Sequence, residues 1–330
     1  MSTRVLICDD SSFARKQMAS ALPDNWDIDL SYANDGKEGV DALKQGKGEI
    51  LFLDLNMPVM DGYQVLEAIR EANLDVMVIV ISGDVQPQAH RRVLQLGALD
   101  FIKKPVNSTE IENTLNKFGI ETNTFETAAA RKEVEYSIRD GYQEVANVAM
   151  GRAADLLARL LDVFIVMPIP SVNTIEVSEL SMALQATNYE KVSAVCQGFI
   201  GAGIAGEALL IFNESSFKDF AELMKYDGEI DDVVEMELVM DIASILIGAC
   251  LKGIAEQLDI QFSQGQPNVL GRHIKVDELL KRNQNRWKQT MAIEMGYTIE
   301  NRNINCDLLL LFTEDSIKTF DELVSYLIEG

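Results

Sequence analysis

Short apolar runs alternate with more polar segments over the first 120 residues of the chain. Most runs stop at a carboxylate, a hydroxyl or a turn residue, after which a helical segment begins. The pattern predicts strands at Val5–Cys8, Ile28–Ala33, Ile50–Leu53, Val76–Ile81 and Asp100–Ile102, and helices at about residues 12–22, 36–44, 62–72, 87–96 and 108–118. The runs at Val5–Cys8, Ile50–Leu53 and Val76–Ile81 are apolar along their whole length. They therefore predict a doubly wound α/β domain whose five-stranded parallel sheet is covered on both faces.

The pattern changes after residue 119. Residues 120–130 are polar and rich in threonine, which favours a linker between a first domain at 1–119 and a second at 131–330. Two long helices are expected in the second domain, from about Arg131 to Leu161 and from Asp232 to Leu258. Paired strand runs follow each helix, at 194–200 with 205–212 and at 291–300 with 306–312, so that the chain is expected to end in strand-rich sequence. The second domain is therefore expected to be α+β.

An internal repeat runs through this second domain. The pattern D-x3-E-x2-N-x22-P recurs in altered form 97 residues later, first as Asp140, Glu144, Asn147 and Pro170, then as Glu237, Asp241, Ser244 and Pro267. The first three positions are i, i+4 and i+7, so they share one stripe of a helix. A solvated polar stripe explains one copy, but two copies at constant spacing, each followed by a proline, favour a functional surface. The repeat also predicts a pseudo-symmetric domain.

Charge and cysteine content narrow the function classes. The 330 residues include 52 Asp and Glu against 29 Lys and Arg, a net charge of −23, which disfavours nucleic acid and anionic lipid as partners. No helix-turn-helix pattern or basic face supports a transcription factor. The four cysteines form no CxxC and suit a reducing compartment. No signal peptide and no apolar segment of about 18 residues is recognised, so a cytoplasmic protein without membrane insertion is expected.

Polar side chains gather at the ends of the first domain's strands, where doubly wound sheets bind ligands. Asp9 and Asp10 end the first strand, Asp54 follows the third, Ser82 follows the fourth, and Lys104 follows the fifth. Three converging carboxylates repel one another unless a divalent cation lies between them, and Mg²⁺ prefers oxygen ligands. This set predicts a metal-assisted phosphoryl acceptor in which Asp54 attacks the phosphoryl donor. Alternatively the aspartate pair is only a helix N-cap cluster, although four matched strand ends count against that.

These motifs resemble the receiver domain of two-component response regulators over residues 3–119. The resemblance implies that a histidine kinase supplies the phosphoryl group and that Asp54 accepts it. It implies Mg²⁺ ligands from Asp10, Asp54 and the Asn56 carbonyl with Asp9 nearby, switch roles for Ser82 and Lys104, and the aromatic switch position for Phe101. By default, an aromatic residue at a strand end is only part of the core. Receivers often pair through the face formed here by residues 87–118, which makes a phosphorylation-linked homodimer an expectation.

The repeat resembles the signature of the CheC/CheX family of chemotaxis phosphatases over residues 131–329. The resemblance implies that Glu144 pairs with the lysine of a target receiver and that Asn147 orients a water in line with its acyl phosphate. Asp140, Pro170, Glu237 and Pro267 are interpreted as supporting positions. The second copy departs from the signature because Asp241 is shorter than glutamate and Ser244 carries no carboxamide. One intact site and a weak or dead second site are therefore expected.

The leading hypothesis is a cytoplasmic response regulator, phosphorylated on Asp54, whose output domain hydrolyses the aspartyl phosphate of a phosphorylated receiver such as CheY. The alternative is a non-catalytic adaptor, controlled by phosphorylation, that binds a receiver or another chemotaxis component. Under the leading hypothesis, Asp54 is expected to act as the switch, and another protein's aspartate is expected to be the main substrate.

Overall fold

A computed structural model describes residues 2–120, 122, 136–175, 191–213, 217–229, 231–275, 290–302 and 304–329. The chain forms two compact units, one of residues 1–144 with 328–330 and one of residues 145–327. Of the predicted linker, residues 121 and 123–130 lie outside the described residues, as does the start of the predicted helix at 131–135. The domain boundary at 119–130 therefore stays a prediction.

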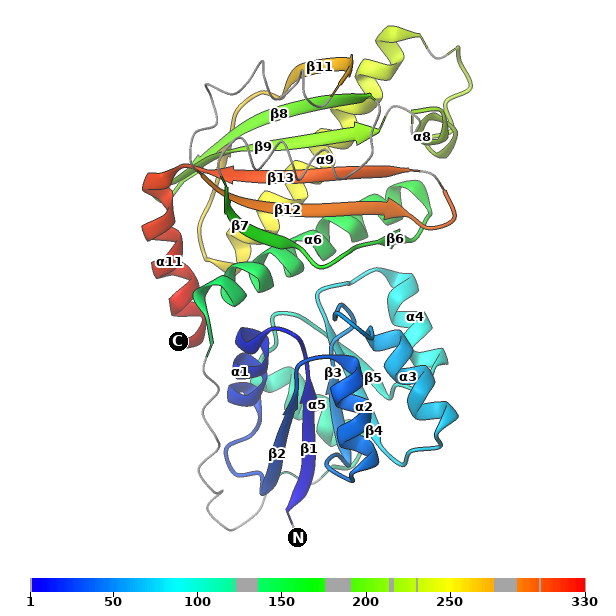
Figure 1. Ribbon diagram of the computed structural model, residues 1–330, viewed down its shortest axis with the longest axis vertical. Helices are drawn as coiled ribbons and strands as arrows, with labels where there is room; N and C mark the ends of the chain where they lie inside the picture. The colour runs from blue at the N-terminus through cyan, green and yellow to red at the C-terminus, as the bar shows by residue number, and fades with distance from the viewer. Residues whose placement is uncertain are drawn as a thin grey trace. The chain divides into compact units, whose positions relative to one another are not determined.

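The first unit contains the predicted parallel sheet (Figure 1). Its strand order is β2-β1-β3-β4-β5. The elements are β1 Thr3–Cys8, α1 Ser12–Ala21, β2 Ile28–Ala33, α2 Gly36–Lys44, β3 Ile50–Leu53, α3 Gly62–Glu71, β4 Met77–Ser82, α4 Pro87–Gln95, β5 Asp100–Lys103 and α5 Ser108–Lys117. All five predicted strands and all five predicted helices are present, with ends within about two residues of the expected ones.

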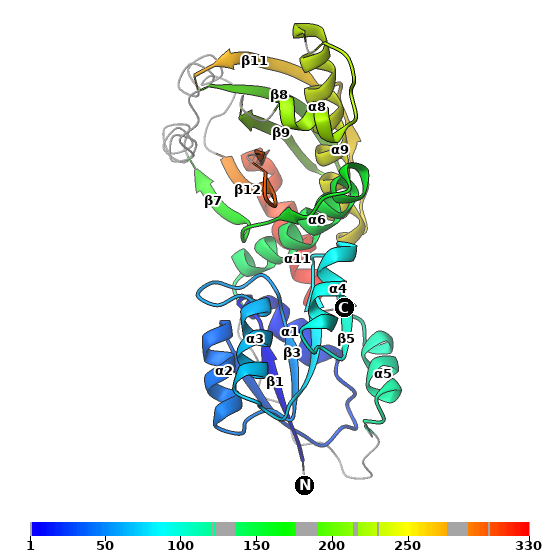
Figure 2. The same ribbon diagram turned by 90° about the vertical axis from the view of Figure 1, so that its right-hand side faces the viewer.

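The two faces of this sheet carry separate hydrophobic cores. On one face Leu6 and Leu51 pack with side chains of α2, α3 and α4, and on the other Ile7 and Phe52 pack with side chains of α1 and α5. Figure 2 shows α2 and α3 on one side of the strands and α5 on the other. Neighbouring residues of a strand point to opposite faces, so a strand buried on both must be apolar throughout. This explains the continuous apolar runs in the sequence.

The second unit is built on an eight-stranded sheet whose strand pairs, within the described residues, are all antiparallel. Its central strands are the antiparallel β8 Val192–Gly201, β9 Ile204–Asn213, β13 Asn305–Phe312 and β12 Thr290–Ile299, and all four were expected from the sequence. Shorter strands extend both edges: β6 Ile165–Val166 and β7 Ser171–Ile175 pair with β12, whereas β10 Ser263–Gln264 and β11 Asn268–Ile274 pair with β8. A short helix, α8 Phe217–Leu223, follows β9.

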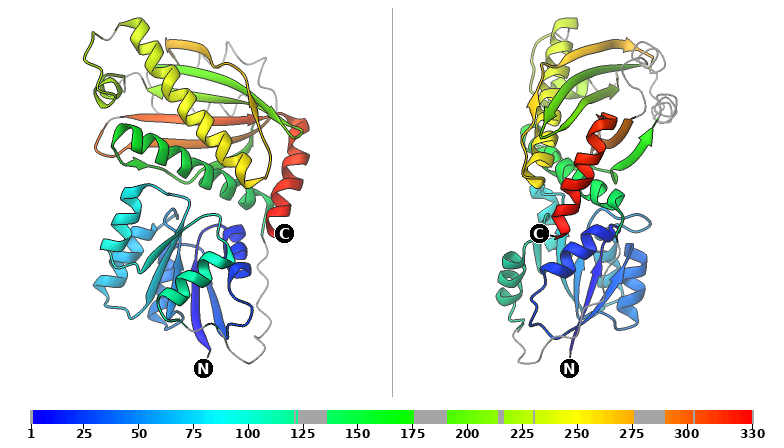
Figure 3. Two further views of the ribbon diagram at one scale, coloured as in Figure 1. Left: turned by 180° about the vertical axis from the view of Figure 1, so that it is seen from behind. Right: turned by 90° about the vertical axis from the view of Figure 1, so that its left-hand side faces the viewer.

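Two long helices cover one face of this sheet, α6 Ile138–Leu161 and α9 Asp232–Gln257 (Figure 3). Residues 145–161 of α6 belong to the second unit. The helices pack closely there, because a Cβ atom added to Gly253 would lie 2.9 Å from the Cα of Ala149. The Gln257 amide donates a hydrogen bond to the Val145 carbonyl at 3.0 Å. Only glycine fits this crossing without displacing backbone.

The expectation that the chain ends in strand-rich sequence was wrong. A helix, α11 Glu314–Glu329, follows the last strand. The buried Phe320 and Val324 are one helical turn apart, and the Ser316 hydroxyl accepts a hydrogen bond from the Ala205 amide at 2.8 Å. The apolar spacing at 317, 320 and 324 is helical, so the sequence itself carries the signal for this helix.

The expectation about apolar segments also needs correction. By length and composition, α9 is apolar enough to cross a membrane, with a mean hydropathy of 1.9 over its most apolar window, 61% of which is buried. Its buried side chains include Ile242, Leu246 and Ile254. A helix that is apolar on most sides is typical of a protein core as well as of a bilayer, so this observation is weak support for a membrane span.

Candidate functional site

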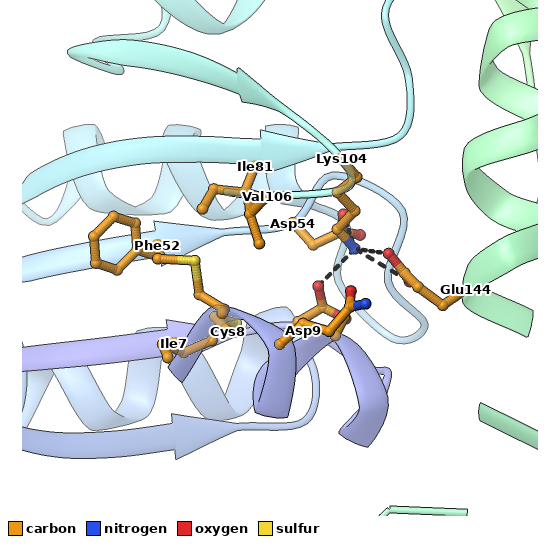
Figure 4. A pocket seen from close by; sticks show the side chains of 12 residues that line it. Ile7, Cys8, Asp9, Phe52, Asp54, Ile81, Lys104, Val106 and Glu144 are labelled. Atoms are coloured by element: carbon orange, nitrogen blue, oxygen red, sulfur yellow. Dashed lines mark hydrogen bonds and ion pairs between the residues drawn. The ribbon is translucent and has the colours of Figure 1, made fainter. Parts of the chain in front are cut away.

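The carboxyl edge of the first unit's sheet brings three of the predicted residues together (Figure 4). The Lys104 ammonium lies 2.7 Å from Oδ2 of Asp9 and 3.0 Å from Oδ1 of Asp54. All three side chains are buried, with exposed fractions of 6%, 2% and 6% for Asp9, Asp54 and Lys104. These residues come from the ends of β1, β3 and β5, as the strand-end pattern predicted.

Backbone hydrogen bonds hold the two carboxylates in place. Asp54 donates its amide to the Cys8 carbonyl at 2.9 Å, which ties the end of β3 to β1. Its Oδ2 accepts from the Asn56 amide at 2.7 Å, and Oδ1 of Asp9 accepts from the Ser11 amide at 2.9 Å. Bonds from backbone amides fix the orientation of a carboxylate and favour its charged form.

Arg15 is a site residue that the sequence reasoning missed. It lies on α1 and is buried, and its Nη1 donates to the carbonyls of Asp9 and Asp10 at 2.6 Å and 3.1 Å. The guanidinium therefore fixes the backbone of Asp9 and Asp10 through their carbonyl groups. An arginine one turn into the helix that follows an acidic pair was the available signal, but it resembles any basic residue on a helix surface.

The site holds more negative than positive charge, and its side chains are buried. Burial raises the pKa of Asp10 to about 7, and the charge of Asp54 adds to this effect. Burial also raises the pKa of Asp9 well above its usual range, although Lys104 opposes the shift. Burial alone would lower the pKa of Lys104, but the carboxylates of Asp54 and Asp9 raise it above its usual range. Lys104 is therefore held protonated, while the carboxylates need more positive charge than it supplies.

The chemistry of this donor set suits Mg²⁺. Oδ1 of Asp54 is buried and accepts no hydrogen bond from the described part of the chain, although the Lys104 ammonium is near. Mg²⁺ takes one or two carboxylates and keeps several waters, so the resident groups need not enclose it. Within the described ranges, no cluster of three or more His, Cys, Asp or Glu side chains is arranged to hold a metal ion as it stands. The position between Asp9 and Asp54 is taken by Lys104.

Three further predicted residues surround this centre. Ser82 ends β4, is fully buried, and its hydroxyl accepts from the Asp84 amide at 3.1 Å. The Asn56 amide already binds Asp54. Phe101 is half-buried on β5, with its ring centroid 5.3 Å from that of His90 on α4. A half-buried ring at the edge of a core fits the predicted switch position as well as the default packing role, so that role stays a prediction.

The start of α6, up to Glu144, belongs to the first unit. Oε1 of Glu144 lies 3.2 Å from the Lys104 ammonium, and the glutamate is 5% exposed. Its pKa is raised by burial, against the opposing effect of Lys104. One turn earlier, Asp140 accepts a hydrogen bond from the Ser12 hydroxyl. Both acidic residues of the first repeat copy therefore contact described residues of the first unit.

The other repeat positions lie in the second unit. Asn147 on α6 is buried, at 7% exposed. The second copy differs: Glu237, Asp241 and Ser244 on α9 are all exposed, and the Ser244 hydroxyl donates to the Met240 carbonyl of its own helix at 2.8 Å. The two prolines, Pro170 and Pro267, each directly precede an edge strand, β7 and β11. The predicted departure of the second copy is thus accompanied by a difference in burial.

Comparison with known proteins identifies the first unit. Residues 5–116 match the family model described as response regulator receiver domain. The chemotaxis protein CheY of Bacillus subtilis is 30% identical over 117 residues, which cover 36% of this chain and 98% of that protein. A protein-glutamate methylesterase/protein-glutamine glutaminase of Geobacter sulfurreducens is 36% identical over 110 residues, 33% of this chain and 29% of that protein. The chain therefore spans less than a third of that relative's length.

Two solved structures are also similar to parts of the chain. The chain covers 96% of Thermotoga maritima FliY at 18% identity and a TM-score of 0.45, over 58% of its own length. It covers 90% of a chain in the CheX–CheY–BeF₃–Mg²⁺ complex of Borrelia burgdorferi at 31% identity and a TM-score of 0.34, over 36% of its own length. Agreement at these TM-scores carries no conclusion about the second unit. The match of residues 5–116 to the receiver model, and the similarity to nearly the whole of a chemotaxis CheY, identify the first unit. Through its receiver domain, this chain belongs to the response regulators of two-component signalling.

Proposed function

We propose that the chain is a response regulator phosphorylated on Asp54, and that its second unit hydrolyses the aspartyl phosphate of a receiver. The observation that carries the proposal is the ion pair between Glu144 and Lys104 at 3.2 Å. Lys104 is the residue that a receiver offers at its phosphorylation site, and Glu144 is the residue to which the resemblance to the CheC/CheX phosphatases gives the role of pairing with such a lysine. A glutamate buried at this position is therefore suited to recognising a receiver.

The receiver chemistry follows from the buried charges. A carboxylate oxygen of Asp54 attacks the phosphorus of a phosphohistidine on a kinase, and the bond from phosphorus to the histidine nitrogen breaks. Asp10, Asp54 and the Asn56 carbonyl would hold Mg²⁺ with Asp9 nearby, and the ion would neutralise charge on the phosphoryl oxygens. Lys104 and the Ser82 hydroxyl bind the remaining phosphoryl oxygens.

Hydrolysis reverses the modification without an enzyme nucleophile. The Asn147 carboxamide orients a water whose oxygen attacks phosphorus, and the bond from phosphorus to the aspartyl oxygen breaks. The products are a free carboxylate and inorganic phosphate. Of the two protons of the attacking water, phosphate keeps one or both at neutral pH, and a proton that it does not keep passes to solvent. Fixing a reactant in line with the bond that breaks supplies much of the acceleration available to such a step.

The pairing of strands in the second unit supports the repeat on which this assignment rests. β6 and β7 of the first copy pair with β12 of the second, while β10 and β11 of the second copy pair with β8 of the first. This reciprocal exchange is what two copies related by a pseudo-twofold axis would give. Ser244 cannot replace the carboxamide of Asn147, so we assign one active site.

A direct test uses the full chain carrying Asp54→Ala, which cannot be phosphorylated itself. The variant is added to a separately phosphorylated CheY-type receiver with Mg²⁺, and phosphate release is followed. The proposal expects release to accelerate with the amount of variant added, and a further Asn147→Ala change to remove the acceleration. Binding to the phosphorylated receiver without any acceleration would instead establish the adaptor function. A cytoplasmic location and a histidine kinase partner are part of the same proposal.

A further inference from the structure

The segment at residues 136–144 makes several contacts within the first unit. The Tyr136 ring packs edge-on against Phe13 of α1, with centroids 5.7 Å apart. The Lys16 ammonium lies 4.7 Å from the centre of the same ring. Ser12 binds Asp140 further along the segment. Aromatic, cation–π and hydrogen-bonding contacts of this kind form a specific attachment to α1.

The contact between Glu144 and Lys104 extends this attachment to the phosphorylation site. Oε1 and Oε2 of Glu144 lie 3.2 Å and 3.4 Å from the ammonium that also contacts Asp54. The side chain of Glu144 is 6% exposed, so its charge has lost nearly all of its water. A buried carboxylate is tolerated when it is paired, and the cation it meets here is part of its own chain. The glutamate is thus already in the contact that the proposed function requires with a target receiver.

We propose that the target of this helix is the receiver of the same chain, and that its substrate is the phosphate on Asp54. The inference rests on the proposed phosphatase function and names the substrate of that site. In the reaction, water oxygen bonds to phosphorus, the aspartyl oxygen keeps the electrons of the broken bond, and inorganic phosphate leaves. The expectation from the sequence, that another protein's aspartate is the main substrate, is the alternative outcome of the test.

Attachment of enzyme and substrate in one chain has a kinetic consequence. A tethered partner acts as if present at about millimolar concentration, well above that of most signalling proteins. Loss of phosphate from Asp54 should therefore be first order and independent of protein concentration. Such a chain limits the duration of its own signal.

The test loads the full chain with radiolabelled acetyl phosphate and Mg²⁺, removes the donor rapidly, and follows the label that remains on Asp54. The half-life is measured over a hundredfold range of protein concentration for the wild type, Asn147→Ala and Glu144→Gln. Arg159→Ala is the matched control, because its side chain is exposed on the same helix and pairs only with Asp155 among the ion pairs described. We expect a concentration-independent half-life, lengthened at least about tenfold by either site variant and unchanged by the control.

A mixing experiment separates this inference from the proposed function. Phosphorylated Asn147→Ala chain is combined with unphosphorylated Asp54→Ala chain, whose Asn147 is intact. Little recovery of the fast rate is expected at equal concentrations, because attachment favours the receiver of the same chain. Recovery is expected only with a large excess of the Asp54→Ala chain, which is also the condition under which that chain should act on a separate receiver. Full recovery at equal concentrations, or a wild-type half-life that shortens with concentration, would show that the substrate is another chain and would leave the phosphatase function standing. If neither site variant lengthens the half-life, intramolecular hydrolysis is rejected. The proposed function also fails if Asp54→Ala chain has no effect on a separate phosphorylated receiver.

Discussion

Lys104 contacts three carboxylates, those of Asp9, Asp54 and Glu144, at one buried point. Each carboxylate raises the pKa of the lysine against the effect of burial. The ammonium thereby links the end of β5 to the ends of β1 and β3. The same group must bind a phosphoryl oxygen after Asp54 is modified. At the phosphorylation site, several anionic groups thus compete for one cation, the Lys104 ammonium.

Replacing Lys104 by methionine should leave the buried carboxylates without this cation. Breaking a buried ion pair by removing one partner costs about 3–5 kcal/mol, so the first unit should lose stability of this order in the absence of metal. Added Mg²⁺ should restore part of the loss and raise the melting temperature of the variant more than that of the wild type. Lys103→Met, at an exposed neighbouring position, is the control and should behave like the wild type. Equal Mg²⁺ responses in all three proteins would contradict the assignment of a cation site here.

Arg15→Ala should make the backbone of Asp9 and Asp10 less rigid. The variant loses hydrogen bonds from a charged donor to the Asp9 and Asp10 carbonyls, each worth about 1.5–3 kcal/mol in proteins. We expect lower stability and weaker Mg²⁺ binding, measured by titration calorimetry on the full chain. Arg15→Lys retains the charge but lacks the planar fork, so it should recover stability only in part. Undiminished Mg²⁺ affinity in Arg15→Ala would mean that the arginine supports only the fold.

Helix α3 shows how one element is fitted to the site. Asp61 caps it, accepting from the Gln64 amide at 2.8 Å, while the Gln64 side chain accepts from the Asp61 amide at 3.0 Å. The first helical residue is Gly62, where an added Cβ would lie 2.4 Å from the Asp54 carbonyl oxygen. The helix can therefore begin directly against the end of β3. The close approach of Gly62 to the Asp54 carbonyl oxygen restricts the path of the loop between β3 and α3.

Gly62→Ala should push α3 away from the phosphorylation site. The added carbon meets backbone atoms, which cannot turn aside as a side chain can, so a loss of about 1–3 kcal/mol is expected from overpacking. Chemical denaturation followed by circular dichroism measures it. Gly248→Ala on α9 is a useful comparison, because its new Cβ would come no nearer than 4.0 Å to a neighbouring atom. That change should be neutral or stabilising by up to about 1 kcal/mol, since alanine favours helix interiors.

Over the whole molecule, the two units differ in how their sheets are covered. The receiver sheet is parallel and has helices and a hydrophobic core on both faces. The second unit joins antiparallel hairpins and carries its two long helices on one face (Figure 3). The four cysteines are free and buried, and three of them, Cys196, Cys250 and Cys306, lie in strands or helices of the second unit. Neither unit depends on a disulfide among its described residues.

All four thiols should resist alkylation in the native protein. Burial raises the pKa of Cys250 to about 12 and raises the pKa of Cys8 and Cys306 further above the usual range. The thiolate is the reactive form, so both accessibility and ionisation oppose the reaction. Iodoacetamide followed by mass spectrometry should find no modification in the native chain and complete modification after denaturation. Rapid labelling of any one cysteine in the native chain would show local opening around it.

The elements of the first unit and the residues at its strand ends can be predicted from the sequence alone. Parallel strands buried on both faces leave a continuous apolar run, and the residue that ends each run marks the carboxyl edge. Asp9, Asp54 and Lys104 were predictable for this reason. The repeat at a spacing of 97 residues was equally visible, because identical side-chain spacing needs no knowledge of the fold. The apolar positions 317, 320 and 324 have helical spacing, so α11 was also predictable from the sequence.

Contacts between side chains that are distant in the sequence become visible in the folded chain. Lys104 and Asp9 are 95 residues apart in the chain, and Lys104 and Glu144 are 40 apart. The direction of the Arg15 guanidinium and the exchange of edge strands between the repeat copies likewise depend on long-range packing. Periodicity reports which face of an element is apolar, but it carries no information about the partner that covers that face. The contact between Glu144 and Lys104, on which the proposed substrate depends, is therefore one that the sequence pattern could not predict.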